Sequence, residues 1–251
     1  MIDEPDGAPL RAVFLDIGDT VMRPNPSWEH VYAIAFREYG IDVEVDALRA
    51  ALRRAYHHGG FGFDDRFEAS EESSFARTME IDRAALTDLG IGPMPEPFFR
   101  RLSELFMLTS NWHVFPDVAP ALGALRERGL VIGAVSNWVW QLPELLHALD
   151  LVSHFDFIAA SSRIGFEKPH PEIFRWALAQ ARAEPAEAIH VGDHLDADVE
   201  GARGAGIEPV LIDRRDRFGP TDIPDGTPLI RSLADLIPIV DARIPARAGG
   251  R

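Results

Sequence analysis

The sequence of 251 residues contains no cysteine. This absence excludes disulfides, thiolate metal sites and a cysteine nucleophile, and it agrees with a reducing compartment. Basic residues are also scarce, because 25 Lys and Arg stand against 40 Asp and Glu, for a formal net charge of −15. A chain of this charge repels nucleic acid and anionic lipid, so we expect neither nucleic acid nor a membrane as a partner.

Long apolar runs are missing as well. A run such as Leu130 to Val135 is far shorter than the roughly 20 residues that cross a bilayer. The acidic start Met1-Ile2-Asp3-Glu4-Pro5 lacks the basic and then apolar profile of a signal peptide. We therefore expect a cytoplasmic protein, and no pattern in the sequence points to a particular oligomeric state.

Apolar residues make up 46% of the chain, enough for a substantial core. Short apolar runs that end in small or acidic residues predict buried parallel strands at 12–15, 131–135, 157–160, 188–191 and 209–212. Apolar residues three and four apart predict helices at 118–128, 139–149, 171–182 and 196–205. This alternation predicts an α/β fold with a doubly wound, Rossmann-like parallel sheet.

The region from about 22 to 110 breaks the alternation, because its pattern is helical and contains no convincing strand. We expect an all-helical domain at 22–110, inserted into a catalytic core formed by 10–21 and 111–240, with mobile termini at 1–9 and 241–251. Its first helix is predicted to have Asn25 as N-cap, Pro26 at the first helical position and Gly40 at its end. Further helices are predicted at about 46–57, 70–89 and 95–108.

Polar residues follow the predicted strands, at the edge where open α/β sheets bind ligands. They are Asp16 after the first strand, Ser136 and Asn137 after the second, Lys168 before the fourth, and Asp193 after the fourth with Asp198 five residues beyond. Such a set suits phosphoryl transfer, in which a carboxylate can be the nucleophile. Asp16 would attack phosphorus, Asp193 and Asp16 would hold Mg²⁺, and Lys168 and Ser136 would hold phosphate oxygens.

The four motifs together resemble those of the haloacid dehalogenase-like hydrolases. The matching segments are Val13-Phe14-Leu15-Asp16-Ile17-Gly18-Asp19-Thr20, Val135-Ser136-Asn137, Lys168-Pro169 and Val191-Gly192-Asp193 through Asp198. The resemblance covers about residues 10–215 and implies that the helical insert is the family's cap domain, which closes over the site. Within the family, Asp16-x-x-Asp19-Thr20 and the sequence from Gly165 to Phe174 are similar to the subgroup named haloacid dehalogenase-like hydrolase domain-containing protein 3.

The resemblance adds roles to several residues. It implies that Thr20 and Ser136 contact phosphate, that the backbone carbonyl of Gly18 is a metal ligand, and that Asp198 accepts hydrogen bonds from water on Mg²⁺. Asn137 has two readings of similar weight, a backbone bond or a contact to substrate. Phosphatases of the family usually carry an acid/base Asp two residues after the nucleophile, where this chain has Gly18. Asp19 is displaced by one residue, so we expect it not to replace that acid.

Three functions follow from this reading. The leading one is a Mg²⁺-dependent phosphatase that acts on a small phosphorylated metabolite through an aspartyl-phosphate on Asp16, and that is weak on alkyl phosphates. The first alternative is a 2-haloacid dehalogenase, which would use Asp16 without metal; Asp193 counts against it. The second is a phosphate-binding or regulatory module with weakened turnover, which Gly18 permits.

A few neighbouring residues carry weaker indications. His190 and His194 flank Asp193, and we expect packing for His190 and a possible substrate contact for His194. Trp138 and Trp140 follow the second motif, where burial between the domains is favoured over a role in an apolar pocket. The Gly-rich loop 57–63 is read as an ordinary connection in preference to a substrate-facing tip.

Overall fold

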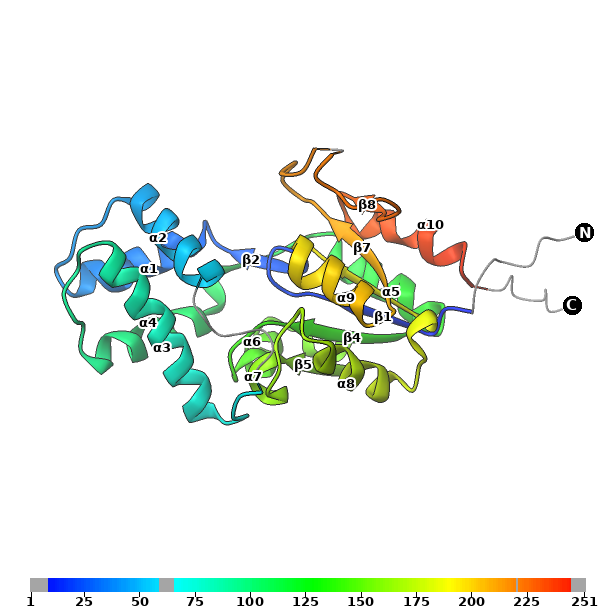
Figure 1. Cartoon of the computed structure of the whole chain (residues 1–251), viewed down its shortest axis with the longest axis horizontal. Coiled ribbons are helices and arrows are strands. Elements are labelled where there is room, and N and C mark those ends of the chain that lie inside the picture. Colours follow the sequence, from blue (N-terminus) through cyan, green and yellow to red (C-terminus); the bar gives the residue numbers. More distant parts are fainter. Residues whose placement is uncertain (1–8, 59–65, 220, 245–251) are drawn as a thin grey trace, which may run out of the picture.

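The computed structural model describes residues 9–58, 66–219 and 221–244 (Figure 1). The predicted N-terminal tail at 1–9, except for its last residue, and most of the Gly-rich loop 57–63 lie outside these residues. Among the described residues, no helix is both long enough and apolar enough to cross a lipid bilayer.

The core is a six-stranded parallel sheet in the order β5-β4-β1-β6-β7-β8. Five of its strands confirm the sequence prediction, and the two-residue β8 was not predicted. The strands are β1 (Ala12–Leu15), β4 (Val131–Ser136), β5 (Phe157–Ala160), β6 (Ala188–Gly192), β7 (Glu208–Ile212) and β8 (Leu229–Ile230).

Side chains of β1 alternate between two apolar layers, which explains why helices cover both faces of the sheet. Val13 and Leu15 pack in one layer, with residues of α5 (Val118–Glu127), α6 (Leu142–Ala148) and α10 (Leu236–Asp241). Ala12 and Phe14 pack in the other, with residues of α8 (Pro171–Ala181) and α9 (Gly201–Gly204). This is the predicted doubly wound arrangement.

Shorter helical segments complete the core. They are α7 (Ser161–Ile164), the 3-10 turns η1 (Thr109–Asn111), η2 (Val152–His154), η3 (Pro185–Glu187) and η5 (Leu233–Asp235), and the π-helical turn η4 (Leu195–Glu200). The helix predicted at 196–205 is therefore two segments, η4 and α9. A π turn widens the backbone and often occurs at functional sites.

Among the described residues, four helices are inserted after β1 and before α5, and Figure 1 shows them gathered to one side of the sheet. They are α1 (Trp28–Glu38), α2 (Val45–His58), α3 (Glu71–Asp88) and α4 (Glu96–Met107). They share an apolar cluster of their own, with Phe36, Leu48 and Phe98 fully buried in it. The predicted helical insert is thus confirmed.

The structure corrects the start of the insert. The helix α1 begins at Trp28 after the N-cap Ser27, so the prediction that Asn25 caps it is wrong. The backbone N–H of Asn25 instead donates to the carbonyl of Asn111 at 2.8 Å. This bond continues an antiparallel ribbon of β2 (Met22–Pro24) and β3 (Trp112–Val114), which joins the insert to the core.

No strand was expected near the start of the insert, and this expectation is wrong for β2. Each ribbon strand has three residues, too few for an alternating pattern to stand out. The first residues of the predicted C-terminal tail contact the core: Asp241 ends α10 and pairs with Arg128, and the carbonyl of Arg243 accepts a bond from Leu10. These contacts attach residues 241–243 to the core.

The strand order reverses at β1. After the insert the chain adds β4 and β5 on one side of β1, and then β6, β7 and β8 on the other. Because β1 lies between β4 and β6, the segments that leave these three strands meet at their carboxyl ends. Open α/β sheets bind ligands at such a switch point.

Candidate active site

Asp16 is the first residue after β1 and lies at the switch point. Its backbone N–H donates to the carbonyl of Val191 in β6 at 2.8 Å, which fixes the residue between the neighbouring strands. Its Oδ1 accepts hydrogen bonds from Ser136 Oγ at 2.9 Å and from Lys168 Nζ at 2.7 Å. Only 7% of the residue is exposed, and burial raises the pKa of its carboxyl despite the opposing charge of Lys168.

Lys168 is buried between two carboxylates. Its Nζ lies 2.7 Å from Asp16 Oδ1 and 2.5 Å from Asp198 Oδ1. Burial alone would lower the pKa of Lys168, but the two carboxylates outweigh it and hold the pKa above its usual value. The lysine is therefore a fixed positive charge beside the carboxylate of Asp16.

Asn137 holds the backbone of Lys168 in place. Its Nδ2 donates to the carbonyl of Lys168 at 2.8 Å, and its Oδ1 accepts the backbone N–H of Lys168 at 2.6 Å. Of the two roles that the sequence left open for Asn137, the structure thus shows the backbone bond. Through this bond, the motif that contains Asn137 positions the motif that contains Lys168.

Asp198 comes from the π-helical turn η4 and collects three donors. Its Oδ1 accepts bonds from Lys168 and from His190 Nε2 at 2.9 Å, and its Oδ2 accepts the backbone N–H of His194 at 3.0 Å. Burial opposes ionisation, but Lys168 and His190 prevail and hold the pKa of Asp198 below its usual range. A Cβ on Gly192 would lie 2.1 Å from Asp198 Cγ, so only glycine allows this approach.

Asp193 is the third acidic residue at this edge. Its Oδ2 and its backbone carbonyl both accept bonds from Arg217 Nη2, at 2.8 and 2.7 Å. Burial and the nearby carboxylates of Asp16 and Asp198 raise its pKa well above the usual value.

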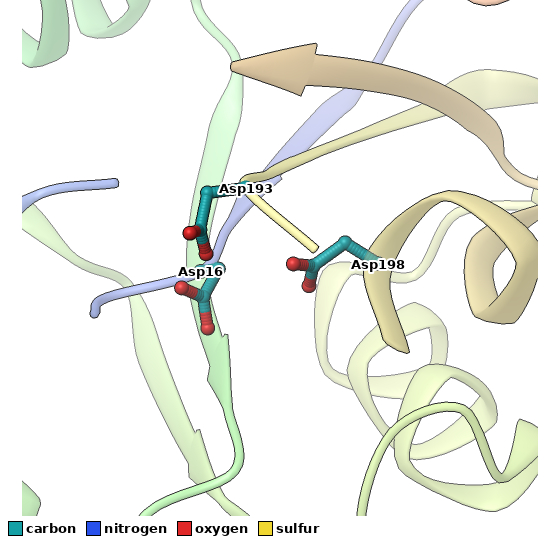
Figure 2. Close-up of side chains that lie close together, drawn as sticks. All are labelled: Asp16, Asp193 and Asp198. Carbon is teal, nitrogen blue, oxygen red and sulfur yellow. The ribbon is translucent and has the colours of Figure 1, made fainter. Parts of the chain in front are cut away.

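Figure 2 shows the three carboxyl groups close together, with Asp16 and Asp193 just after β1 and β6 and Asp198 within the turn η4. Oxygen atoms of Asp16, Asp193 and Asp198 all lie within 4.8 Å of one another. Three carboxylates this close repel one another unless a cation lies among them. An all-oxygen set of this kind is one that a hard divalent cation prefers.

The structure also locates the remaining predicted residues of the first motif. Gly18 is half-buried, and Thr20 is fully buried with its Oγ1 lacking a hydrogen-bond partner among the described residues. Asp19 has a left-handed backbone, with a φ of 53°, and its carboxylate accepts a bond from Arg215. The proposed contact of Thr20 with phosphate stays a prediction.

The two histidines beside Asp193 have different surroundings. His190 is fully buried and packs edge-on against Phe174, as expected, but it also bonds Asp198, a contact that was not predicted. This contact depends on the turn η4, whose π-helical form no local sequence pattern indicates. His194 accepts the N–H of Ala197 at Nδ1, at 3.3 Å, and so caps the start of η4.

An arginine-rich segment after β7 was missed as well. Arg214 donates to the carbonyl of Thr20 at 2.8 Å, Arg215 donates to Asp19, and Arg217 donates to Asp193. The run Asp213-Arg214-Arg215-Asp216-Arg217 follows the last predicted strand at the same sheet edge, and that position could have identified it.

Asp213 anchors this arginine-rich segment. It is fully buried and accepts bonds from the backbone N–H groups of Arg215 at 3.2 Å and Phe218 at 3.0 Å, and from Arg231 Nη1 at 2.7 Å. Burial acts against the charged form, but these donors outweigh it and lower the pKa of Asp213 to about 2.

Comparison with known proteins agrees with this geometry. The chain is 30% identical over 237 residues to the haloacid dehalogenase-like hydrolase domain-containing protein 3 of Bos taurus, covering 92% of this chain and 94% of that protein. It is 35% identical to the phosphoserine phosphatase of Thermus thermophilus, covering 88% of this chain and 95% of the relative.

Among solved structures, the fold matches the HAD-hydrolase YfnB from Bacillus subtilis in a form bound to magnesium. The TM-score is 0.69 at 20% identity, covering 93% of this chain and 99% of that chain. The family model for haloacid dehalogenase-like hydrolases matches residues 10–206, a range that includes all four motifs. On the fold, the site and this match, the chain belongs to the haloacid dehalogenase-like hydrolase family, a family of enzymes.

Proposed function

We propose that this hydrolase is a Mg²⁺-dependent phosphatase of a small phosphorylated metabolite, with Asp16 as its nucleophile. The observation that carries the proposal is the cluster of Asp16, Asp193 and Asp198 around the buried ammonium group of Lys168. Phosphoryl transfer needs a positioned nucleophile and neutralisation of charge, and this cluster offers the groups for both.

The residues present fit a divalent metal ion. Asp16 and Asp193 would be the carboxylate ligands, with the backbone carbonyl of Gly18 as a further oxygen and Asp198 beside them. The raised pKa of Asp193 has neighbouring negative charge among its causes, and a bound cation would relieve that repulsion. When bound, Mg²⁺ would neutralise charge on the phosphoryl oxygens and allow an anionic nucleophile to approach them.

The chain's own residues then have the following roles. Ser136 and Lys168 both bond Oδ1 of Asp16, which leaves its Oδ2 as the attacking atom. The new Oδ2–P bond forms while the bond from phosphorus to the leaving oxygen breaks, and that oxygen departs with the electron pair. Water then attacks the phosphorus of the aspartyl-phosphate, which releases phosphate and restores the carboxylate.

Gly18 limits this chemistry. No side chain is present at the position where relatives of the family carry their acid/base, and Asp19 is paired with Arg215. Leaving groups that depart without a proton should therefore react best, so alkyl phosphates should be poor substrates. General acid catalysis typically contributes about 10²–10⁴-fold, which sets the size of the expected loss.

Two features favour a phosphatase over a 2-haloacid dehalogenase, although both chemistries can use an aspartate nucleophile. A halide leaves carbon without help from a metal, so the carboxylate of Asp193, crowded against Asp16, would serve no purpose in that reaction. The relative from Thermus thermophilus with 35% identity is a phosphoserine phosphatase.

A screen of phosphorylated metabolites with Mg²⁺, with chloroacetate as the dehalogenase substrate, tests the proposal. Asp193→Asn should nearly abolish phosphate release, whereas Asp196→Asn, an exposed carboxylate three residues away, should not. Beryllofluoride should trap Asp16 as a phosphoryl mimic. Phosphate release that survives exhaustive chelation, or chloride release from chloroacetate, would contradict the phosphatase.

A weakened binding module is the other outcome. In that case, the wild type would bind phosphate analogues with saturating Mg²⁺ but would release no phosphate from any member of the screen. Aryl and acyl phosphates belong in the screen for this reason, because they depend least on the missing acid.

A further inference from the structure

The space beside Gly18 is filled by an aromatic ring. A Cβ built on Gly18 would lie 3.3 Å from Cζ3 of Trp138, which is closer than most side-chain contacts. The φ of Gly18 is outside the left-handed region, so its backbone would accept other residues. A side chain at position 18 would therefore have to displace the indole of Trp138 by a few tenths of an ångström.

Trp138 is near the nucleophile from two directions. It follows Ser136 by two residues, and Ser136 Oγ donates to Asp16 at 2.9 Å. Its ring also lies next to the space that a side chain at Gly18, two residues after Asp16, would occupy. The ring therefore lies on the side of Asp16 where relatives of the family have their acid/base group.

The structure fixes the backbone of Trp138 firmly. Its N–H donates to Ser161 Oγ at 3.1 Å, and its carbonyl accepts a bond from Ser162 Oγ at 2.8 Å. A ring held on such a backbone can act as a rigid wall of a pocket.

Aromatic neighbours from both parts of the molecule hold the ring of Trp138. The ring centroid of Trp112 in β3 lies 5.4 Å away, and that of Trp28, the first residue of α1, lies 6.0 Å away. Trp138 remains partly exposed within this cluster. The insert and the core thus both set the position of this partly exposed indole next to Gly18.

We propose that Trp138 forms the leaving-group side of the substrate pocket and that the substrate is a phosphate monoester with an aromatic leaving group. This inference rests on the proposed phosphatase function and names its substrate class. An indole ring offers an aromatic substituent a flat apolar partner. A phenolate also departs with its electron pair more readily than an alkoxide, so it suits a site without an acid at position 18.

Binding of non-reacting analogues tests the pocket without the chemistry. Phenylphosphonate and methylphosphonate share the anionic group and differ in the ring, so their inhibition constants against a common substrate are compared with Mg²⁺ present. Aromatic pairs typically favour contact by about 0.5–1.5 kcal/mol beyond the area they bury, which is roughly 2- to 12-fold in affinity. The inhibition constant of the wild type should therefore be lower for phenylphosphonate than for methylphosphonate by a factor within or above this range.

Three variants locate the effect. Trp138→Leu should remove most of the preference, and Trp138→Phe should retain it, because a phenyl ring can still stack. Trp176→Leu is the matched control, since Trp176 is a half-buried tryptophan that packs on Phe157 away from Asp16. This control should keep the wild-type ratio of inhibition constants.

The outcomes separate this inference from the proposed function. Hydrolysis of acetyl phosphate with equal inhibition by the two phosphonates would overturn the aromatic pocket and leave the phosphatase intact. A wild type that hydrolyses neither acetyl phosphate nor 1-naphthyl phosphate would overturn the phosphatase. If Trp138→Leu fails to fold, the wild-type ratio and the Trp138→Phe variant still decide the question. A phenyl preference that survives in a folded Trp138→Leu variant would assign the contact to another residue and refute the proposal.

Discussion

The helical insert contains a buried carboxyl group that should make stability depend on pH. Asp82 in α3 is 3% exposed, and its Oδ1 accepts a hydrogen bond from Tyr32 Oη at 2.6 Å. The carboxyl group borders a cavity of about 10 Å³, lined by apolar residues that include Phe36 and Leu48. Such a cavity has room for about one water, so the carboxylate is poorly hydrated. Burial raises the pKa of Asp82 to about 7.

The sign of the effect follows from the two pKa values of Asp82. Because the folded state has the higher pKa, about 7 against an ordinary 3.8, folding favours the protonated carboxyl. The stabilisation is complete below the unfolded pKa and is lost as the pH rises through the folded pKa. One pKa unit corresponds to about 1.36 kcal/mol, so the full interval is worth about 4 kcal/mol. About half of it, about 2 kcal/mol, should be lost between pH 5.5 and pH 8.

Urea unfolding across this pH range measures the effect, starting above the sequence pI of about 5.0. Asp82→Asn should remove this part of the pH dependence, because the amide cannot ionise but can still accept the bond from Tyr32. The variant should therefore become more stable than the wild type at pH 8. Glu80→Gln, an exposed change on the same helix, should keep the wild-type slope. Parallel pH profiles for Asp82→Asn and the wild type would refute the reasoning.

Three further predictions concern the active site. Lys168→Met should lower kcat by about 10²-fold or more, which is the typical effect of losing a preorganised charge. It should also lower Tm, because Asp16 and Asp198 lose a buried partner. An unchanged kcat with an altered Tm would show that the lysine is purely structural. Gly192→Ala should abolish the binding of Mg²⁺ that calorimetry measures, because the added Cβ would displace Asp198. Normal Mg²⁺ binding by this variant would contradict the prediction. Stopped-flow release of 4-nitrophenolate should show a burst of about one equivalent, because Gly18 leaves the second step without a base, and a linear trace would refute that order of steps.

The regular part of the fold could be predicted from the sequence because its patterns are local. Strands β1 and β5 lie at the predicted residues, since each is a short apolar run with a clear end. The ribbon of β2 and β3 was missed because its two segments lie about 90 residues apart and pair through long-range contacts. The same contacts draw Asn25 into the ribbon and move the start of α1 to Trp28.

In the site, too, the features that follow from local motifs could be predicted, and the contacts that depend on long-range packing could not. Motifs on successive strand ends predicted that Asp16, Asp193 and Lys168 would meet, because parallel strands share one carboxyl edge. The bond from His190 to Asp198 could not be predicted, since it depends on the π turn that brings Asp198 back over the strand. The proximity of Trp138 to Gly18 could not be predicted either, because these residues lie in two loops whose relative position depends on the packing of the whole sheet.

In the proposed phosphatase, the charges around Asp16 would connect substrate binding to metal binding. Asp16, Asp19, Asp193 and Asp198 bring four carboxylates, and Lys168, Arg215 and Arg217 bring three positive groups in direct contact with them. With every group ionised the set has a net charge of −1, which repels a phosphate dianion across a buried site of low dielectric constant. A divalent cation changes the net charge to +1. Lys168 and the two arginines alone do not make the net charge positive. In the proposed phosphatase, the dianion and the cation would therefore each bind better when the other is present, and this reciprocity follows from linkage.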